Sequence, residues 1–171
     1  KKSFVKKKWE AKKAVVVFIN QADEATWQEL HGIGPYYARR IVRFREALGG
    51  FHRIEQIAET YGLPDSVFQK VKARLRLQEA ARPLDINRLG EEELAGHPYL
   101  SRREAAALIA YRREHGPLSG MDELHNIRAL RKESLEKLGP YLQFSRDIGP
   151  RKDTIVEKTR TLAEGSGEDE R

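Results

Sequence analysis

The chain has 171 residues, enough for one domain or two small ones, with 39% hydrophobic and 34% charged residues. It contains no cysteine, which excludes disulfides and thiolate metal sites. The longest apolar stretch, residues 14–19, is far too short to span a bilayer, and no signal peptide is visible. Because the sequence begins at Lys1 rather than at a methionine, it is compatible with an excerpt whose targeting segment was removed.

The formal net charge of +6 is concentrated at the N-terminus. Residues 1–17 hold seven lysines and one glutamate, whereas residues 18–171 are close to neutral. This distribution excludes a uniformly basic protein. It predicts a basic N-terminal arm over residues 1–17, in which the β-branched residues 15–17 form a short extended lead-in.

Several short helices are predicted in the next 60 residues. The first spans residues 23–30, with Asn20 or Asp23 near its N-cap. The second follows from the apolar spacing of Tyr37, Ile41, Phe44 and Leu48, with Gly49 as a left-handed C-cap residue. Two more are predicted over residues 54–60 and 66–75. No stretch alternates with period two, so no sheet is expected.

An internal repeat organises the chain. Ile19-Asn20 recurs as Ile86-Asn87, an offset of 67, and at that offset the two halves align without a gap. Apolar positions match through both halves although identity is low. The matched pairs include Ala38 with Ala105, Ile41 with Leu108, Phe44 with Tyr111, Gly49 with Gly116, Phe51 with Leu118, Ile57 with Leu124 and Phe68 with Leu135.

The repeat divides the chain into two tandem units of about four short helices each, which predicts an all-α fold. Unit one is residues 18–78, the linker is residues 79–83, and unit two is residues 84–144. Residues 145–171 form a C-terminal tail with one predicted helix over residues 153–163 and a disordered end at residues 165–171. Pro83 ends any helix that continues from unit one.

A tight turn precedes the long helix of unit one, in the sequence LHGIGPYYARRIV that begins at Leu30. Gly32 and Gly34 allow positive φ, and Pro35 suits the first turn of the following helix. The free amides after the turn point outward at the positive end of the helix dipole, which favours an anion. Phosphate contacts of this kind carry no base information, so duplex DNA bound with little sequence preference is the implied ligand.

Three arginines lie beside this turn, on the side opposite the apolar stripe, where they can meet neighbouring phosphates. The candidate DNA contacts are Gly32, Ile33, Gly34, Tyr36, Tyr37, Arg39, Arg40 and Arg43. Secondary candidates are Gly62, Lys6, Lys7, Lys8, Arg102 and Arg103.

The run from Leu30 to Pro35, followed by Ala38, Ile41 and Val42, resembles a helix-hairpin-helix motif. The surrounding pattern over residues 19–77 resembles the ComEA family of competence DNA receptors, and residues 86–144 resemble it more loosely. Tyr61-Gly62-Leu63-Pro64 resembles the second, looser hairpin of that domain. The resemblance implies a SAM-domain-like fold, duplex DNA as partner, DNA uptake at a bacterial envelope and a monovalent cation on the hairpin carbonyls.

Unit two departs from this pattern at the turn. Tyr99, Ser101 and Arg102 replace Gly32, Gly34 and Pro35, and Ala106, Ala107 and Ala110 replace the three arginines. We expect unit two to keep the fold and to lose most of the phosphate site. The small face of residues 105–107 would suit contact with unit one or with a protein partner.

Arg45 of unit one and Arg112 of unit two are equivalent positions, so an arginine is present there in both units. We expect these two arginines to order the fold through a carboxylate or helix-end carbonyls rather than to contact DNA. The lysine arm has three readings: an arm on DNA, a polybasic segment beside a membrane anchor, or a solvated tail. The five histidines are scattered, and Glu91, Glu92 and Glu93 are consecutive, which is typical of a first helical turn rather than a metal site.

These features predict a binding protein rather than an enzyme, with no cofactor beyond the implied cation and no small-molecule substrate. The main alternative is a structural or protein-interaction module whose hairpins only pack. A further alternative is the DNA-positioning component of a repair assembly. Localisation at the envelope is favoured by the resemblance, with the cytoplasm second.

Overall fold

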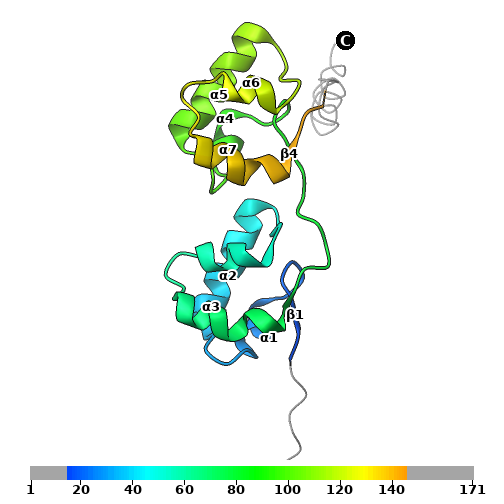
Figure 1. The fold of residues 1–171 in the computed structure, drawn as a ribbon, viewed down its shortest axis with the longest axis vertical. Helices are drawn as coiled ribbons and strands as arrows, with labels where there is room; N and C mark the ends of the chain where they lie inside the picture. The colour runs from blue at the N-terminus through cyan, green and yellow to red at the C-terminus, as the bar shows by residue number, and fades with distance from the viewer. Residues whose placement is uncertain (1–14, 146–171) are drawn as a thin grey trace, which may run out of the picture.

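A computed structural model describes residues 15–145, which form two helical units placed one beyond the other along the long axis of the molecule (Figure 1). Most of the predicted basic arm, including Lys6, Lys7 and Lys8, lies outside the described residues. So do the predicted helix over residues 153–163 and the predicted disordered end at residues 165–171.

Unit one begins and ends with a short strand and has helical segments between the two strands. Its elements are β1 (Val17–Phe18), α1 (Glu24–Gln28), α2 (Pro35–Leu48), the 3-10 helix η1 (Ile54–Glu59), α3 (Asp65–Val71), the 3-10 helix η2 (Lys72–Arg74) and β2 (Leu75–Arg76).

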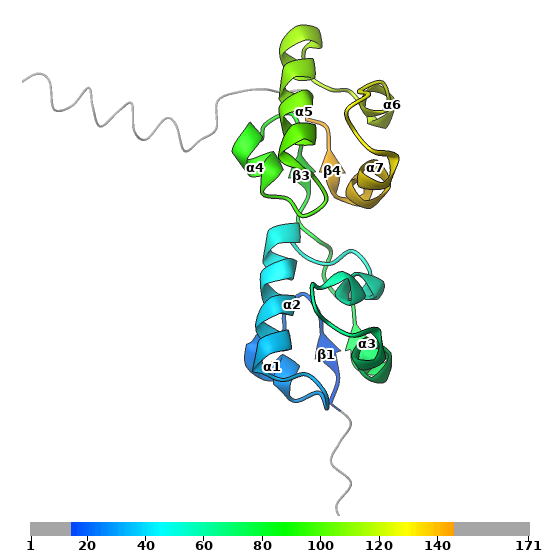
Figure 2. The same ribbon diagram turned by 90° about the vertical axis from the view of Figure 1, so that its left-hand side faces the viewer.

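Unit two repeats this order, and its elements confirm the predicted duplication. They are β3 (Leu84–Asp85), α4 (Glu91–Ala95), α5 (Arg102–His115), α6 (Met121–His125), α7 (Lys132–Leu138), the 3-10 helix η3 (Gly139–Tyr141) and β4 (Leu142–Gln143). The two 14-residue helices α2 and α5 follow one another along the long axis in Figure 2. The predicted all-α fold is confirmed.

The expectation of no sheet was wrong in a minor respect. Val17 pairs with Leu75 and Leu84 pairs with Leu142 in two parallel two-stranded sheets, one in each unit. Strands of two residues are too short to produce an alternating pattern, so the sequence gives no period-two signal for them. Each pair ties the start of a unit to its end.

Helix ends follow the predicted chemistry in most places. Asp23 is the N-cap of α1, and its side chain accepts a hydrogen bond from the Thr26 amide at 2.8 Å. Gly49 ends α2 in the left-handed conformation, with φ of 78°. Gly116, the equivalent residue of unit two, ends α5 with φ of 86° but with extended ψ, so it does not form the left-handed cap seen at Gly49.

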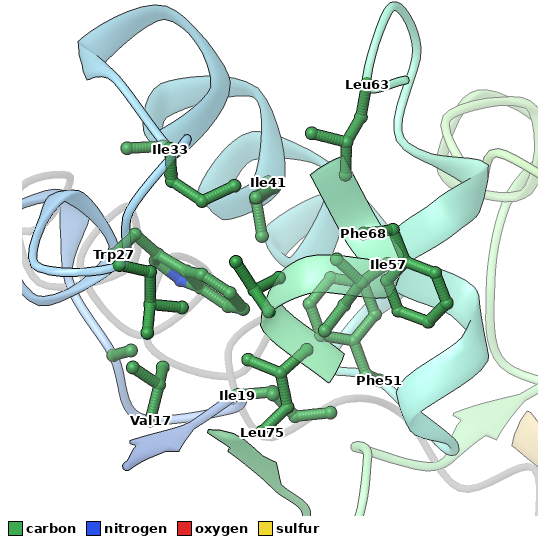
Figure 3. Packing of buried hydrophobic residues seen from close by; sticks show 14 of the residues in the cluster. Val17, Ile19, Trp27, Ile33, Ile41, Phe51, Ile57, Leu63, Phe68 and Leu75 are labelled. Atoms are coloured by element: carbon green, nitrogen blue, oxygen red, sulfur yellow. The ribbon is translucent and has the colours of Figure 1, made fainter. Parts of the chain in front are cut away.

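The core of unit one lies between α2 and the other elements of the unit, namely β1, α1, η1, α3 and β2 (Figure 3). Trp27 of α1 and Ile41 of α2 are fully buried there, and Phe51 and Leu75 complete the centre. Unit two has its own core at equivalent positions, with Leu108 in place of Ile41 and Leu118 in place of Phe51. Burial of one fully apolar side chain stabilises a fold by about 1.5–3 kcal/mol, so each unit has an independent source of stability.

Two polar contacts recur in both units at the same offset. Asn20 bonds both the amide and the carbonyl of Phe51, at 2.7 and 2.9 Å, and Asn87 bonds Leu118 in the same way. Arg45 donates to the carbonyl of Ala22. Its counterpart Arg112 donates to the carbonyls of Ile86 and Leu89, at 2.8 and 2.7 Å. Both arginines therefore order the fold as predicted, but the acceptors are loop carbonyls rather than the expected carboxylate or helix-end carbonyls.

The predicted linker, residues 79–83, lies against unit one. The carbonyl of Glu79 accepts from Asn20 at 2.7 Å, and the amide of Arg82 donates to the carbonyl of Gly49 at 2.8 Å. Gly50 has φ of 117°, and a Cβ there would come within 3.0 Å of the Ala81 backbone. A glycine is therefore needed at position 50 for both its conformation and its contact.

The contact between the two units is centred on one buried side-chain amide, that of Gln56 in η1, which is 3% exposed. Its oxygen accepts from the amides of His52 and Arg53, at 2.6 and 2.9 Å. Its nitrogen donates to the hydroxyls of Tyr99 and Tyr141, at 2.9 and 2.7 Å. All four hydrogen-bonding positions of the amide are therefore filled, two by each unit.

Other groups extend this contact. The Tyr141 hydroxyl donates to the carbonyl of Gly50 at 3.0 Å, and Lys137 pairs with Glu59 at 3.4 Å. Burial raises the pKa of Tyr141, although the hydrogen bond from Gln56 works in the opposite direction. Both tyrosines belong to the hydrophobic cluster of unit one rather than to that of their own unit.

Replacement of Tyr141 by phenylalanine removes a hydroxyl with partners on both sides of this contact. Tyr141→Phe should lower the free energy of unfolding by about 1–3 kcal/mol, because Gln56 and Gly50 each lose a buried partner. Urea titration followed by circular dichroism measures this loss. The matched control is Tyr111→Phe, since Tyr111 makes no hydroxyl hydrogen bond within residues 15–145; equal losses in both variants would contradict the prediction.

Candidate nucleic-acid interface

The turn between α1 and α2 forms the first hairpin of unit one. Gly32 has φ of 98°, a region that favours glycine, whereas Gly34 is extended with φ of −90° and ψ of 178°. The Ile33 side chain points into the core and is 3% exposed, and its amide donates to the carbonyl of Leu30 at 3.0 Å. Ile33 can therefore offer a ligand only its backbone carbonyl.

The N-terminal end of α2 has free hydrogen-bond donors. Pro35 contributes no amide, and Gly34, the N-cap residue, has no side chain to cap the helix. No acceptor within residues 15–145 takes the amides of Gly34, Tyr36 or Tyr37. A Cβ at Gly34 would meet nothing within 4 Å, so the space beside this turn is open. Such a helix end favours an anion.

Two of the three predicted arginines are available to a ligand. Arg39 is exposed and its Nε lies 3.7 Å from Glu24, in a surface ion pair. A pair of this kind contributes at most about 1 kcal/mol, so a phosphate can displace it. Arg43 is exposed and has no ion pair or hydrogen-bond partner among residues 15–145. Both follow the open amides along α2.

The third arginine, Arg40, has a different environment. Its guanidinium lies between two tyrosine rings, 4.4 Å from the centroid of Tyr36 and 4.7 Å from that of Tyr61. Its Nη1 donates to the carbonyl of Tyr61 at 2.8 Å. Arg40 therefore joins the first hairpin to the second instead of extending freely from α2.

The second hairpin depends on Gly62, which has φ of 78°. A Cβ at this position would approach Arg40 Nη1 to 3.2 Å. Glycine is thus required for the turn and gives the arginine room to reach the Tyr61 carbonyl. The two hairpins of unit one form one continuous surface through this contact.

The corresponding turn of unit two faces unit one. Tyr99 replaces Gly32, and no non-glycine residue between 15 and 145 has positive φ, so the turn has a different backbone. Tyr99 and His97 are buried, and their rings lie 5.5 Å apart in an edge-on contact. The first hairpin of unit two is therefore a docking element between the units.

The N-terminus of α5 also carries its own anion. The buried carboxylate of Glu104 accepts from the Ser101 amide at 2.9 Å and from the Ser101 hydroxyl at 2.7 Å. Its other oxygen accepts from the Arg131 amide at 3.1 Å. These hydrogen bonds hold the pKa of Glu104 well below its usual range, despite the opposing effect of burial. The Ser101 amide corresponds to the open amide of Gly34.

The remaining predicted residues of unit two have different surroundings. Arg102 and Arg103 are exposed at the start of α5, and Arg102 lines a depression of about 410 Å³ together with Glu91 and Glu92. Of the expected face of residues 105–107, Ala105 is buried in the core of its own unit and Ala107 packs against that core, while contact with a protein partner stays a prediction. The turn before α5, together with Tyr141, makes the contact with unit one instead.

Sequence reasoning missed Glu104, Gln56 and Tyr61. The spacing Ser101-Arg102-Arg103-Glu104 is a capping-box pattern and could have indicated the carboxylate. Gln56 and Tyr61 give no such signal, because their partners come from distant parts of the chain.

Within residues 15–145, no helix is long and apolar enough to cross a membrane, and no group of three or more metal-ligating side chains is present. The chain matches the family model "Helix-hairpin-helix motif" twice, over residues 12–76 and 79–143. It therefore belongs to the helix-hairpin-helix family, with two copies in tandem, and the family indicates DNA as the partner.

Curated relatives fall into two groups. One group is endonuclease/exonuclease/phosphatase family domain-containing protein 1. The chain is 25% identical to it over 152 residues in Bos taurus and 24% identical over 152 residues in Xenopus laevis, and the match spans 27% of the length of each relative. ComE operon protein 1 of Bacillus subtilis (strain 168) is 33% identical over 66 residues, which is 39% of this chain and 32% of the relative. The predicted ComE resemblance is confirmed. No solved structure matches significantly.

The burial of His97 predicts an acid-dependent loss of stability. Burial lowers the pKa of His97 from 6.5 to about 4, and the nearby Leu48 carbonyl offsets this lowering only in part. The Nε2 atom of His97 has no hydrogen-bond partner among residues 15–145. Between these values the unfolded chain binds more protons than the folded one, so the free energy of unfolding rises with pH. Stability should fall by about 2 kcal/mol from pH 7 to pH 5 through this group.

His97→Leu tests this, because Leu30 is the buried counterpart in unit one. Urea unfolding of the variant at pH 7 and pH 5 should show a smaller difference than in the unchanged protein. His31→Leu, at an exposed histidine, is the control and should retain the full difference. A His97→Leu variant with an unchanged pH dependence would refute the assignment.

Proposed function

We propose that unit one binds duplex DNA without sequence preference, through the open amides of Gly34, Tyr36 and Tyr37 and the arginines beside them. One observation supports this most directly: the Gly34 amide is open in unit one, whereas its counterpart in unit two, the Ser101 amide, donates to the chain's own carboxylate, Glu104. A scaffold duplicated within one chain thus supplies its own comparison. The open copy is suited to a phosphate.

The proposed contacts are with the DNA backbone. Amides and exposed arginines bind phosphate oxygens, which are the same at every base pair, so they position the protein without reading sequence. The exposed side chains of Arg39 and Arg43 would neutralise phosphates on either side of the one held by the amides. The monovalent cation implied by the resemblance belongs to the same proposal, since the Leu30 carbonyl keeps a free lone pair beside its bond to Ile33.

Unit two has a positioning role in this proposal. Its turn is buried against unit one, and it could also present a surface to a protein partner. We assign these two units binding without catalysis. The similarity to ComE operon protein 1 supports a role in competence and DNA uptake in a bacterium.

A second candidate is the DNA-positioning part of a larger protein or assembly. The observation that favours it is that the relatives named for an endonuclease/exonuclease/phosphatase domain match over 152 residues, long enough to include both units, whereas the ComE relative matches over 66. DNA binding by unit one is common to both candidates.

Replacement of the two available arginines tests the proposal. Arg39→Ala with Arg43→Ala should weaken binding of a blunt duplex of unrelated sequence in fluorescence anisotropy. It should also reduce the slope of log affinity against log salt by about 2, one for each lost phosphate contact. The control Arg113→Ala with Arg128→Ala removes the same charge from exposed positions of unit two and should leave most of the affinity. Equal effects of the two double variants would contradict the proposed site.

Gly34→Ala is a sharper test of the backbone contact. Gly34 has an ordinary extended conformation and an added Cβ meets nothing within 4 Å, so the substitution causes no clash or strain, and the poorer N-cap residue should lower the free energy of unfolding by no more than about 1 kcal/mol. The methyl group would stand in front of the amides and hinder the close approach of a phosphate. Duplex affinity should fall several-fold at unchanged net charge. Full affinity in a normally folded Gly34→Ala variant would place the DNA elsewhere.

A further inference from the structure

We infer that Tyr36, Arg40 and Tyr61 form a stacking platform for an unpaired base, so that unit one prefers duplex DNA that ends in a single strand. This inference rests on the proposed function, because it specifies which form of DNA the same surface binds best. Its starting observation is the arginine held between two exposed aromatic rings that come from the two different hairpins of unit one.

The two rings are unusually accessible for large side chains. Tyr61 is 83% exposed and Tyr36 is 59% exposed, the two highest values among the large hydrophobic and aromatic residues of the described chain. Neither hydroxyl makes a hydrogen bond within residues 15–145, so the rings are not there to place a polar group. Their recorded contacts are with the Arg40 guanidinium and, for Tyr36, an edge-on contact with Tyr37.

Arg40 keeps these rings in place without covering them. Its hydrogen bond goes to the Tyr61 carbonyl, and its guanidinium occupies one side of each ring. The contact fixes an otherwise mobile exposed side chain before any ligand arrives, which reduces the entropy lost on binding. A guanidinium beside the rings also adds positive charge where a nucleotide would stack.

The platform adjoins the proposed phosphate site. Tyr36 contributes both an open backbone amide to that site and a ring to the platform. A strand whose phosphate contacts the amide therefore places its next bases beside the rings. Bases inside a duplex already stack on each other, so the rings can stack only on a base at an end or in a single strand.

Unit two lacks every part of the platform. Arg103, Ala107 and Arg128 stand at the positions of Tyr36, Arg40 and Tyr61. Gly62, which gives Arg40 its room, is Ala129 there. The aromatic platform adjoins the open amides in unit one and has no counterpart in unit two, where the Ser101 amide, the equivalent of the Gly34 amide, is taken by Glu104. This pairing points to one ligand that uses both.

The test compares a blunt duplex with the same duplex carrying a short thymidine tail, on one strand or the other, in fluorescence anisotropy at matched salt. Stacking on one base is worth about 1–3 kcal/mol, so the unchanged protein should bind one tailed duplex about 5- to 150-fold more tightly. A 2-aminopurine placed as the first unpaired base should change its fluorescence on binding, which reports stacking directly.

Tyr61→Ala should abolish both the preference for the tail and the 2-aminopurine signal, while blunt-duplex affinity stays within about twofold because the phosphate contacts remain. Tyr61→Phe is the matched control and should keep both, since stacking needs the ring and not the hydroxyl. If the tyrosines serve only to hold Arg40, the unchanged protein will bind both DNAs equally without a 2-aminopurine signal, which overturns the inference alone. Failure to bind either DNA at low salt would overturn the proposed function as well.

Discussion

The arrangement of the two units depends on one buried side-chain amide, that of Gln56. A buried amide is costly unless its donors and acceptors are all satisfied, and here two backbone amides and two tyrosine hydroxyls satisfy them. The backbone amides belong to unit one and the hydroxyls to unit two, so separation of the units would leave the amide nitrogen without its protein partners. The stacking seen in Figure 2 is therefore specified by a defined set of hydrogen bonds in addition to apolar contact.

This contact explains why the two hairpins have such different surfaces. A turn that must fit against the end of α2 needs bulk and hydrogen bonding, and Tyr99 supplies both where unit one has Gly32. A turn that must admit a phosphate needs the opposite: no side chain and no internal acceptor. The same position in one scaffold cannot meet both demands. The duplication allows one copy to be used for docking and leaves the other for the proposed ligand, and in the docking copy Glu104 accepts from the Ser101 amide, the counterpart of the open Gly34 amide.

The sequence predicted the features that depend on neighbours along the chain. The helical spacing of apolar residues predicted α2, and the 67-residue offset predicted the two units. The residues Gly32, Gly34 and Pro35 predicted the hairpin with its open amides. Features that depend on distant partners were not predictable in this way. Gln56 bonds to tyrosines that lie 43 and 85 residues further along the chain. The position of Arg40 is set by Tyr61, which lies outside α2 and so cannot be inferred from the residue pattern of that helix. Helix geometry placed Arg40 on an exposed face, but only the second hairpin explains its contacts.

The two exposed arginines and the enclosed one would divide the tasks of the proposed DNA-binding surface. Arg39 and Arg43 have weak or no internal partners, so their charge is available to phosphates at little cost. Arg40 has given up that freedom to a carbonyl and two rings, and it orders the tips of both hairpins. An ordered tip matters because the amides of α2 hold a phosphate only in a fixed direction, whereas free arginines attract it from any direction. The enclosed arginine therefore contributes through the geometry of the surface, and the exposed pair contributes through its charge.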